Sequence, residues 1–280
     1  MTVSTRPPFL RRRLGAKARR MREEAGLTLS EAADLLDKTK SALHRVETGE
    51  TRLDVHLARS MMDKYDIYDP KLVDDAREAA KTPWYRAFGV EDMGYVDVET
   101  SAARVNEFSV LLVPGLLQTD AYMDAVFSSG HSQDPARMES QHKIRRIRQA
   151  RLTDEERPLK IHAVLDEAAL HREVGGAVVM REQLLHLIAV AARPAVTLRI
   201  LPFDRGAHRS LMGSFTVLEF PDPSDPPMLY VEFPMGSLHI EDVEKVGEAK
   251  LRFEQLRRTA LNLAYSVELL ERLAVELYGA

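Results

Sequence analysis

The chain has 280 residues, enough for one large or two ordinary domains, and its 45% hydrophobic and 29% charged residues exclude a disordered or fibrous protein. It contains no cysteine, which excludes disulfides and thiolate metal sites, and no apolar run approaches the ~20 residues that span a membrane. The arginines near the start are not followed by an apolar segment, so no signal peptide is predicted, and we expect a cytoplasmic protein.

Charge is distributed unevenly along the chain. Residues 1–27 contain eight basic and two acidic side chains, a net charge of +6, whereas the whole chain carries -4, so the remainder carries -10. A basic N-terminal stretch on an acidic body is expected of a protein that presents one face to phosphates. A solvated, charged first helix would give the same pattern.

The first eighty residues are predicted to form five short helices. These cover residues 9–25, 29–36, 40–48, 55–65 and 70–80. Thr28, Thr39 and Asp54 are suited to N-capping, and Glu31 follows Thr28 at the spacing of a capping box. Short helices that each carry one apolar stripe pack together as a small all-α bundle.

A change of pattern at Pro83 marks a predicted domain boundary, dividing the chain into residues 1–81 and residues 82–280. In the second part, helices are predicted over residues 99–109, 114–128, 135–151, 178–193 and within 242–277, with a short one ending at 170. Strands are predicted over residues 159–165, 196–201, 214–220, 228–233 and 238–240. The proline-rich stretch 221–227 is predicted to join two strands as a hairpin connection. The second domain is therefore expected to be α+β, with a small sheet flanked by helices.

Residues 27–49, in which a short turn joins two predicted helices, carry most of the information about function. Ala32 and Ala33 are small enough to let the helices cross closely. The residues spaced to fill the seam are apolar: Leu36, Leu43 and Val46. The outward positions of the next helix hold donors suited to phosphates and base edges: Lys40, Ser41, His44 and Arg45. A helix of this kind can pack by one face and enter a major groove with the other, although a solvated face is the alternative.

With these residues, the stretch resembles the Xre-type helix-turn-helix of phage-repressor-like regulators. The matching positions are Leu27, Thr28, Ala32, Ala33, Leu43, Arg45, Glu47 and Gly49. Leu29 departs from the pattern, since many relatives have a glutamine there that touches the DNA backbone. Asp37 replaces the glycine that usually makes the turn, which suggests a different turn conformation. The resemblance implies an all-α helix-turn-helix domain that binds double-stranded DNA.

Four further motifs lie in the second domain. They are VPGLLQT at residues 113–119, VLDEAAL at 164–170, the set LPF, GAH and GSF within 201–215, and LEFPDP at 218–223. Together they resemble the C-terminal domain of the antitoxin-like, WhiJ-type regulators of filamentous high-GC bacteria. The resemblance implies a regulator encoded beside a small protein that it binds, with a C-terminal domain that binds this partner or a ligand.

We therefore expect a sequence-specific transcriptional regulator, not an enzyme. One short helix touches few base pairs, so a homodimer is expected on DNA, with half-sites about 10 base pairs apart or a multiple of it. The dimer contact is expected outside the helix over residues 40–48, in the C-terminal domain. The candidate DNA-binding residues are Thr28, Ser30, Thr39, Lys40, Ser41, His44, Arg45, Thr51 and Arg52.

Two alternatives from other classes stay open: an antitoxin that mainly sequesters a small protein, and an enzyme in the C-terminal domain. Asp166 and Glu167 follow a predicted buried strand, where α/β enzymes place acids, but helix capping by Asp166 is the preferred explanation of the pattern. Asp204, His208 and Ser210 are close in sequence, yet a triad is defined by geometry. The dispersed histidines lack metal-ligand spacing, so no catalytic residue, metal or cofactor is predicted.

Overall fold

The computed structural model describes residues 9–89, 94–129 and 134–279. Contacts between residues divide the chain into two units, Met1–Ser101 and Ala102–Ala280. This division groups residues 82–101 with the helical unit, and the domain boundary after residue 81 stays a prediction. None of the helices described combines the length and the apolarity that a membrane crossing requires.

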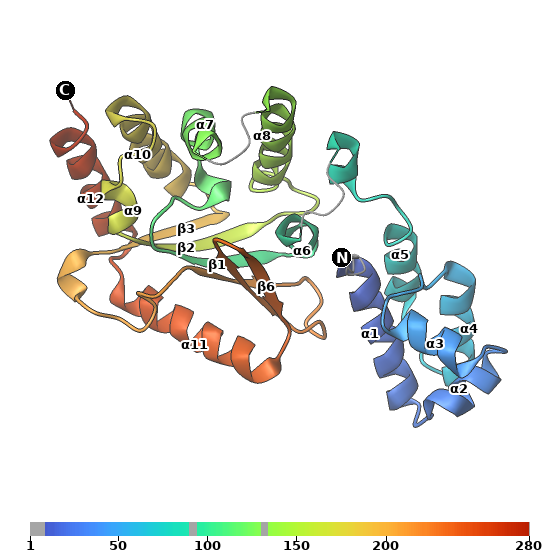
Figure 1. Cartoon of the computed structure of the whole chain (residues 1–280). Helices are drawn as coiled ribbons and strands as arrows, with labels where there is room; N and C mark the ends of the chain where they lie inside the picture. Colours follow the sequence, from blue (N-terminus) through green and yellow to red (C-terminus); the bar gives the residue numbers. More distant parts are fainter. Residues whose placement is uncertain (1–8, 90–93, 130–133, 280) are drawn as a thin grey trace. The chain divides into compact units, whose positions relative to one another are not determined.

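The first unit is built from helices throughout the part that the structure describes (Figure 1). Its helices are α1 (Phe9–Glu24), α2 (Leu29–Leu35), α3 (Lys40–Glu47), α4 (Val55–Tyr65), α5 (Pro70–Glu78) and α6 (Tyr95–Ser101), with a 3₁₀ turn at Trp84–Phe88. Helices α1 to α5 match the five predicted helices to within two residues at each end. The prediction of an all-α N-terminal domain is confirmed.

The predicted caps account for these accurate helix starts. The Thr28 hydroxyl accepts a hydrogen bond from the backbone N–H of Glu31, whose carboxylate accepts one from the N–H of Thr28, completing the capping box. Thr39 caps α3 and Asp54 caps α4 in the same way, through backbone N–H groups three residues on. Each cap satisfies a backbone donor that the helix itself leaves unpaired.

One hydrophobic core joins α1 to α5. Its buried members include the predicted seam: Ala32, Ala33, Leu36, Leu43 and Val46. From α1 the core takes Leu14, Ala18 and Met21, which recur at helical spacing. These buried residues define which faces of α2 and α3 pack into the core, and the opposite faces of both helices are left exposed.

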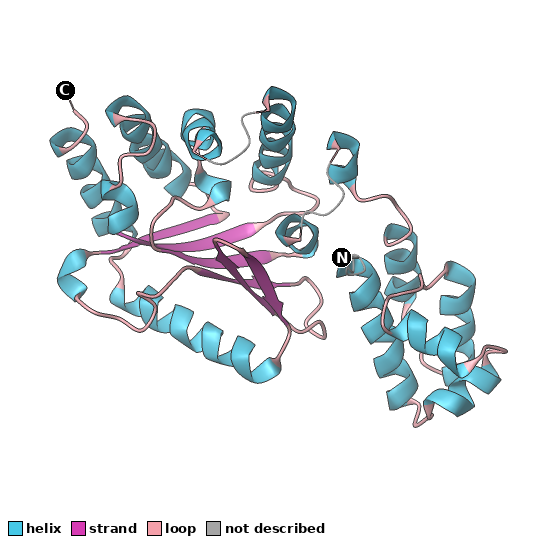
Figure 2. Ribbon diagram, viewed as in Figure 1, coloured by secondary structure: helices cyan, strands magenta, loops and turns pink. Residues whose placement is uncertain are grey.

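The second unit is α+β, with one six-stranded sheet among helices (Figure 2). The strands are β1 (Arg104–Ser109), β2 (Lys160–Asp166), β3 (Val196–Leu201), β4 (Phe215–Glu219), β5 (Met228–Phe233) and β6 (Gly236–Ile240). The helices are α7 (Asp120–Ser128), α8 (Pro135–Ala150), α9 (Ala168–His171), α10 (Ala177–Ala191), α11 (Val243–Thr259) and α12 (Leu263–Glu276). The predicted fold class is confirmed.

The sheet is mixed, in the order β3-β2-β1-β4-β5-β6. Strands β1, β2 and β3 are parallel, with Val105 of β1 opposite Ile161 of β2, whereas β4, β5 and β6 continue as an antiparallel meander. Because β4 and β5 pair directly, the stretch 221–227 is a hairpin connection as predicted. The carboxyl ends of the three parallel strands meet at one edge of the sheet.

Helices cover both faces of this sheet. Helix α11 lies on one face, and α7, α8, α10 and α12 lie on the other (Figure 1). The side of α11 that packs on the sheet carries Val246, Ala249, Phe253 and Leu256, at helical spacing. The sheet is therefore buried as the centre of three layers.

The predicted helix over residues 99–109 is wrong in its second half, since residues 104–109 form β1 in the middle of the sheet. Val98, Ala102, Val105 and Phe108 recur every three or four residues, which imitates a helix. A central strand is buried on both faces, so it loses the alternation that identifies a strand. The helix predicted from Pro114 instead begins at α7, after a 3₁₀ turn.

Candidate nucleic-acid interface

Helix α3 has two chemically distinct faces. Lys40, Ser41, His44 and Arg45 are all exposed, while Leu43, Val46 and Glu47 are buried against the rest of the unit. Positions separated by one, four and five residues share one side of a helix, so the four exposed side chains form a single surface. We call Lys40, Ser41, His44 and Arg45 the α3 face.

The cationic side chains near the α3 face are not engaged elsewhere in the unit. Within residues 9–89 and 94–101, the side chains of Lys40, His44, Arg45 and Arg52 form no hydrogen bond or ion pair. Arg45 is in the last turn of α3, and its backbone carbonyl accepts the N–H of Thr51 at 2.8 Å. That bond holds the segment with Thr51 and Arg52, both exposed, beside the end of the helix.

The remaining candidates lie at helix starts and are exposed. Ser30 is in the first turn of α2, and Thr28 and Thr39 are the N-caps of α2 and α3. The Thr28 hydroxyl also donates to the Glu31 carboxylate at 2.7 Å, so capping already uses both its donor and its acceptor. The nine candidates thus come from α2, α3 and the segments beside them.

The turn between α2 and α3 corrects one expectation. Asp37 adopts a φ of 53°, in the left-handed region that glycine favours. The aspartate therefore makes this turn in a glycine-like backbone conformation, and the expected different conformation is wrong in this respect. Aspartate tolerates that region better than most residues do.

A buried ion pair that sequence analysis missed holds α3 in place. The Arg22 guanidinium on α1 donates to both carboxylate oxygens of Glu47, at 2.7 and 3.0 Å, and to the carbonyl oxygen of Leu27 at 2.8 Å. The two side chains are 9% and 4% exposed. The pair also raises the pKa of Arg22, chiefly through the hydrogen bond to Glu47. Glu47 therefore has a structural role in the helix-turn-helix, because it holds α3 against α1.

Two glycines let α1 approach the end of α3 closely. A Cβ on Gly15 would lie 2.7 Å from the carbonyl oxygen of Glu47, and one on Gly49 would lie 2.7 Å from the Cα of Arg12. Gly49 also has a φ of 77°, which a side chain would strain. The tight contact sets the position of α3 on its support.

Much of the positive charge counted in the N-terminal stretch is compensated inside the unit. Lys17 lies 2.5 Å from Asp69 and 3.7 Å from Asp75, and Arg19 pairs with Glu23 at 2.7 Å. Together with the Arg22–Glu47 pair, these contacts neutralise three of the eight basic side chains of residues 1–27 that were expected to face phosphates. The α3 face is thus a better candidate for DNA contact than α1.

In the second unit, the two acids at the end of β2, Asp166 and Glu167, have structural partners. Asp166 accepts the backbone N–H of Ala168 at 2.9 Å, which is the helix-capping role predicted for it. Glu167 accepts the N–H of Phe203 at 2.8 Å and lies 3.2 Å from the His171 ring. These bonds tie the turn after β2 to the turn after β3.

The sequence cluster Asp204, His208 and Ser210 does not assemble as a triad. The Nε2 of His208 lies 3.3 Å from Asp166, while Asp204 forms an ion pair with its neighbour Arg205 at 3.5 Å. Across the stretches that the structure describes, no three His, Asp or Glu side chains gather as metal ligands. The arrangement brings together His208 and Asp166, which lie 42 residues apart in the sequence.

Comparison with known proteins identifies both units. A family model described as a helix-turn-helix domain matches residues 13–76, and one described as a domain of unknown function (DUF5753) matches residues 93–272. No curated protein gives a significant match. A crystal structure of the clp gene regulator ClgR from C. glutamicum matches at 24% identity, covering 28% of this chain and 100% of that chain, with a TM-score of 0.23.

Helix-turn-helix domains are DNA-binding modules, and such a domain indicates a DNA-binding regulator. The DUF5753 match extends over more than half of the residues. The chain therefore belongs to the DUF5753 family and carries a helix-turn-helix domain ahead of the family domain.

Proposed function

We propose that this protein is a sequence-specific transcriptional regulator that reads double-stranded DNA with α3. The observation that carries the proposal is the α3 face, whose exposed cations and hydroxyl have no partner among the described residues while the opposite face is locked by Arg22 and Glu47. Arginine is the side chain best suited to the acceptor edge of guanine, and Arg45 is the member of the face assigned to it.

The remaining candidates are assigned to the DNA backbone. Ser30, Thr39, Thr51 and Arg52 flank the α3 face, where hydroxyl, backbone and guanidinium donors position a helix on phosphates without reading sequence. Thr28 acts chiefly through its cap, which fixes where α2 begins. This division predicts that the α3 face sets sequence preference and that Arg52 sets salt dependence.

The test is selection of binding sites from a random pool of double-stranded DNA by the full chain. We expect an enriched sequence, and we expect a variant with alanine at all four positions of the α3 face to enrich none. The control is Lys81→Ala, which removes an exposed cation paired with Glu78 on α5. Equal enrichment by the four-alanine variant and the control would refute the assignment of α3.

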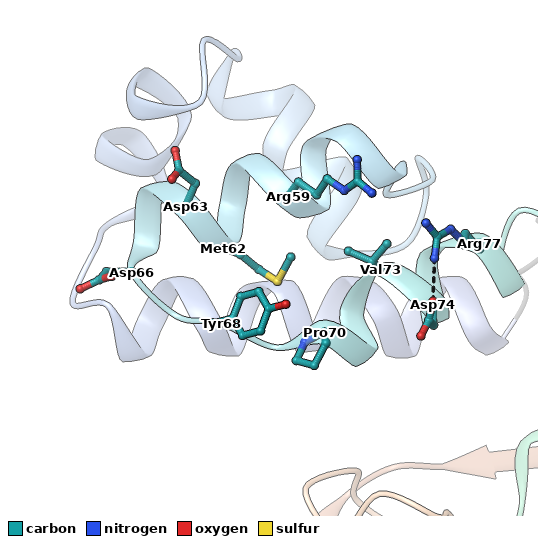
Figure 3. Close-up of a pocket in the computed structure, with 9 residues that line it drawn as sticks. All are labelled: Arg59, Met62, Asp63, Asp66, Tyr68, Pro70, Val73, Asp74 and Arg77. Atoms are coloured by element: carbon teal, nitrogen blue, oxygen red, sulfur yellow. Dashed lines mark hydrogen bonds and ion pairs between the residues drawn. The ribbon is translucent and has the colours of Figure 1, made fainter.

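We further propose a homodimer, with two heads that read two half-sites. A groove of about 630 Å³ between α4 and α5 supports a contact in the first unit, although the sequence favoured the C-terminal domain. Figure 3 shows its apolar centre, formed by Met62, Tyr68, Pro70 and Val73. Tyr68 is 82% exposed, so a partner that covers it would bury most of the surface of its side chain.

The charges around this groove suit a second copy. Asp63 and Asp66 lie at one end, and Arg59 and Arg77 lie toward the other (Figure 3). Arg77 pairs with the exposed Asp74 at 2.8 Å, whereas Arg59, Asp63 and Asp66 form no ion pair with any residue described. A two-fold axis places the acidic end of one copy over the basic end of the other, so the surface is complementary to itself.

Charge reversal tests this dimer. Asp63→Arg with Asp66→Arg, and separately Arg59→Asp with Arg77→Asp, should each give monomers in sedimentation velocity, because like charges then face each other. A mixture of the two variants should form heterodimers, since both contacts become attractive again. Dimers of either variant alone, or no dimers in the mixture, would refute the groove as the interface.

The C-terminal domain is proposed to bind a partner or ligand that controls DNA binding. Exposed apolar side chains in the loop after β3 support a protein partner: Phe203, Leu211 and Met212, the last 97% exposed. Val110, directly after β1, donates its N–H to the Ser214 hydroxyl at 3.0 Å, which connects this loop to the segment after β1. Exposed apolar groups of this kind commonly mark protein contacts.

The product of the adjacent small gene is the partner to test, by co-purification and by measuring DNA affinity with and without it. A partner changes DNA affinity only if it binds the competent and incompetent states unequally. Complex formation with no change in DNA affinity would favour the antitoxin role. No complex at micromolar concentration, together with turnover of a metabolite, would favour an enzyme.

A further inference from the structure

A small cavity in the second unit lies between the loop after β3 and helix α11. Its volume is about 150 Å³. Leu201, the last residue of β3, and Leu256 of α11 form apolar walls, and both belong to the core between the sheet and α11. The cavity thus opens at the carboxyl end of a parallel strand, the edge at which open α/β sheets bind their ligands.

The side chains contributed by the loop are polar and held in place. His208 lines the cavity, and its Nε2 lies 3.3 Å from Asp166. A carboxylate can only accept, so Nε2 is the donor in this contact and Nδ1 is left for a second contact. The ring also packs edge-on against Phe108, with ring centroids 5.5 Å apart. His208 is therefore fixed between β1 and β2 at the wall of the cavity.

The second nitrogen of this ring is not used by the protein. The Nδ1 of His208 is shielded from solvent and has no hydrogen-bond partner among the described residues. Buried polar atoms without a protein partner are uncommon, and many bind water or a ligand instead. Ser210, which is 7% exposed, adds a hydroxyl to the same wall.

Two arginines line the cavity and give it positive charge. Arg209 is exposed and forms no ion pair with a described residue, although its charge acts on the Glu248 carboxylate and helps to lower the pKa of that group. Arg252 on α11 pairs with Glu248 at 2.5 Å, in a contact whose partners are 39% and 60% exposed. An exposed pair of this kind contributes little to stability and can exchange its acceptor. Asp166 is not a lining residue, and both its oxygens accept hydrogen bonds.

These features select one class of ligand. A cavity of this volume accommodates a molecule the size of benzene, with about six non-hydrogen atoms. Apolar walls favour an alkyl chain, and a guanidinium favours a carboxylate, to which it can donate two parallel hydrogen bonds. We propose that this cavity binds a short-chain carboxylate, with Arg209 and Arg252 on the carboxylate and the alkyl chain against Leu201 and Leu256.

This inference rests on the proposed role of the C-terminal domain as a ligand-binding module, and it names the site and the ligand class. It is tested without DNA, so it can fail while DNA binding by α3 stands. Equally, loss of the proposed DNA contacts leaves the cavity and its lining residues unchanged.

The experiment is titration calorimetry of the full chain with acetate, propionate, butyrate and inorganic phosphate in a buffer low in chloride. Affinity should rise from acetate to butyrate as the apolar walls are covered, and butyrate should bind with a Kd of about 1 mM or tighter. Phosphate should bind more weakly than butyrate. Absence of butyrate binding, or phosphate binding tighter than butyrate, would overturn the proposal.

Variants of exposed residues locate the site without endangering the fold. Arg209→Ala should weaken butyrate binding about tenfold, because it removes a charge-assisted hydrogen bond. Arg258→Ala, which removes an exposed arginine of α11 outside the cavity, should leave the affinity unchanged. Butyrate should also shift the ¹⁵N resonances of the His208 ring. Equal effects of the two substitutions, or an unmoved His208 signal, would contradict the assignment.

Discussion

The Arg22–Glu47 pair gives the sharpest prediction about the helix-turn-helix unit. Glu47→Ala removes the acceptor of two hydrogen bonds and leaves the Arg22 guanidinium, whose side chain is 9% exposed, in the interior without its counter-charge. Removing one partner of a buried pair costs about 3–5 kcal/mol, because the remaining charge stays desolvated. Small domains have unfolding free energies of about 5–15 kcal/mol, so the loss is a large fraction of the total.

The double variant separates charge burial from packing. Arg22→Met with Glu47→Leu keeps side chains of similar length and removes both charges, and such replacements are often neutral or stabilising. We therefore expect the double variant to recover most of the stability that Glu47→Ala loses. The expected difference in unfolding free energy between Glu47→Ala and the double variant corresponds to a shift of about 12 °C or more in Tm for a unit of this size.

The assay is hydrogen exchange of the backbone amides of α1 and α3, followed by mass spectrometry, together with thermal unfolding. Glu47→Ala should accelerate exchange in both helices, while amides of the central strands β1 and β2 should exchange as in the wild type. Unchanged protection in α3, or a double variant as unstable as Glu47→Ala, would refute the role assigned to the pair.

Three further predictions concern other parts of the fold. Gly15→Ala should destabilise the first unit by about 1–3 kcal/mol in chemical denaturation, because the crowding of its Cβ against the Glu47 carbonyl outweighs the usual helix preference for alanine. Gln183→Leu should lower the unfolding free energy by about 1–3 kcal/mol for each backbone group that loses its hydrogen-bond partner. The fully buried Gln183 amide accepts the N–H of Thr119 and donates to the carbonyl of Leu117. Burial, aided by nearby Arg104, lowers the pKa of His162 below its usual value of 6.5, so the unfolded chain binds more protons just below that pH. The unfolding free energy should accordingly fall as pH drops from about 6.5 toward the folded pKa, and His162→Gln should flatten that slope in melts across pH.

The helices of the first unit could be predicted closely because their start signals are local. Thr28, Thr39 and Asp54 each bond a backbone N–H three residues ahead, so a short window of sequence contains both partners. The faces of α3 follow from the same local periodicity. Strand β1 was missed because its neighbours β2 and β4 lie about 50 and 110 residues further on, and only they reveal that it is central.

The contacts that support the candidate sites could not be predicted for the same reason. Arg22 and Glu47 are 25 residues apart, and nothing near either residue indicates the other. His208 was grouped with Asp204 by proximity in sequence, whereas the fold pairs it with Asp166 across parallel strands. Proximity in sequence says little about side chains that belong to different turns at one sheet edge.

The α3 face is tested most directly by fluorescence anisotropy of a selected DNA site with the full chain and Arg45→Ala. A base-reading arginine contributes about 1–3 kcal/mol, so Arg45→Ala should raise the Kd about 10- to 100-fold, with Lys81→Ala unchanged. The variant with alanine at Lys40, Ser41, His44 and Arg45 should not discriminate the selected site from random DNA. Wild-type affinity and discrimination in that variant would contradict the account.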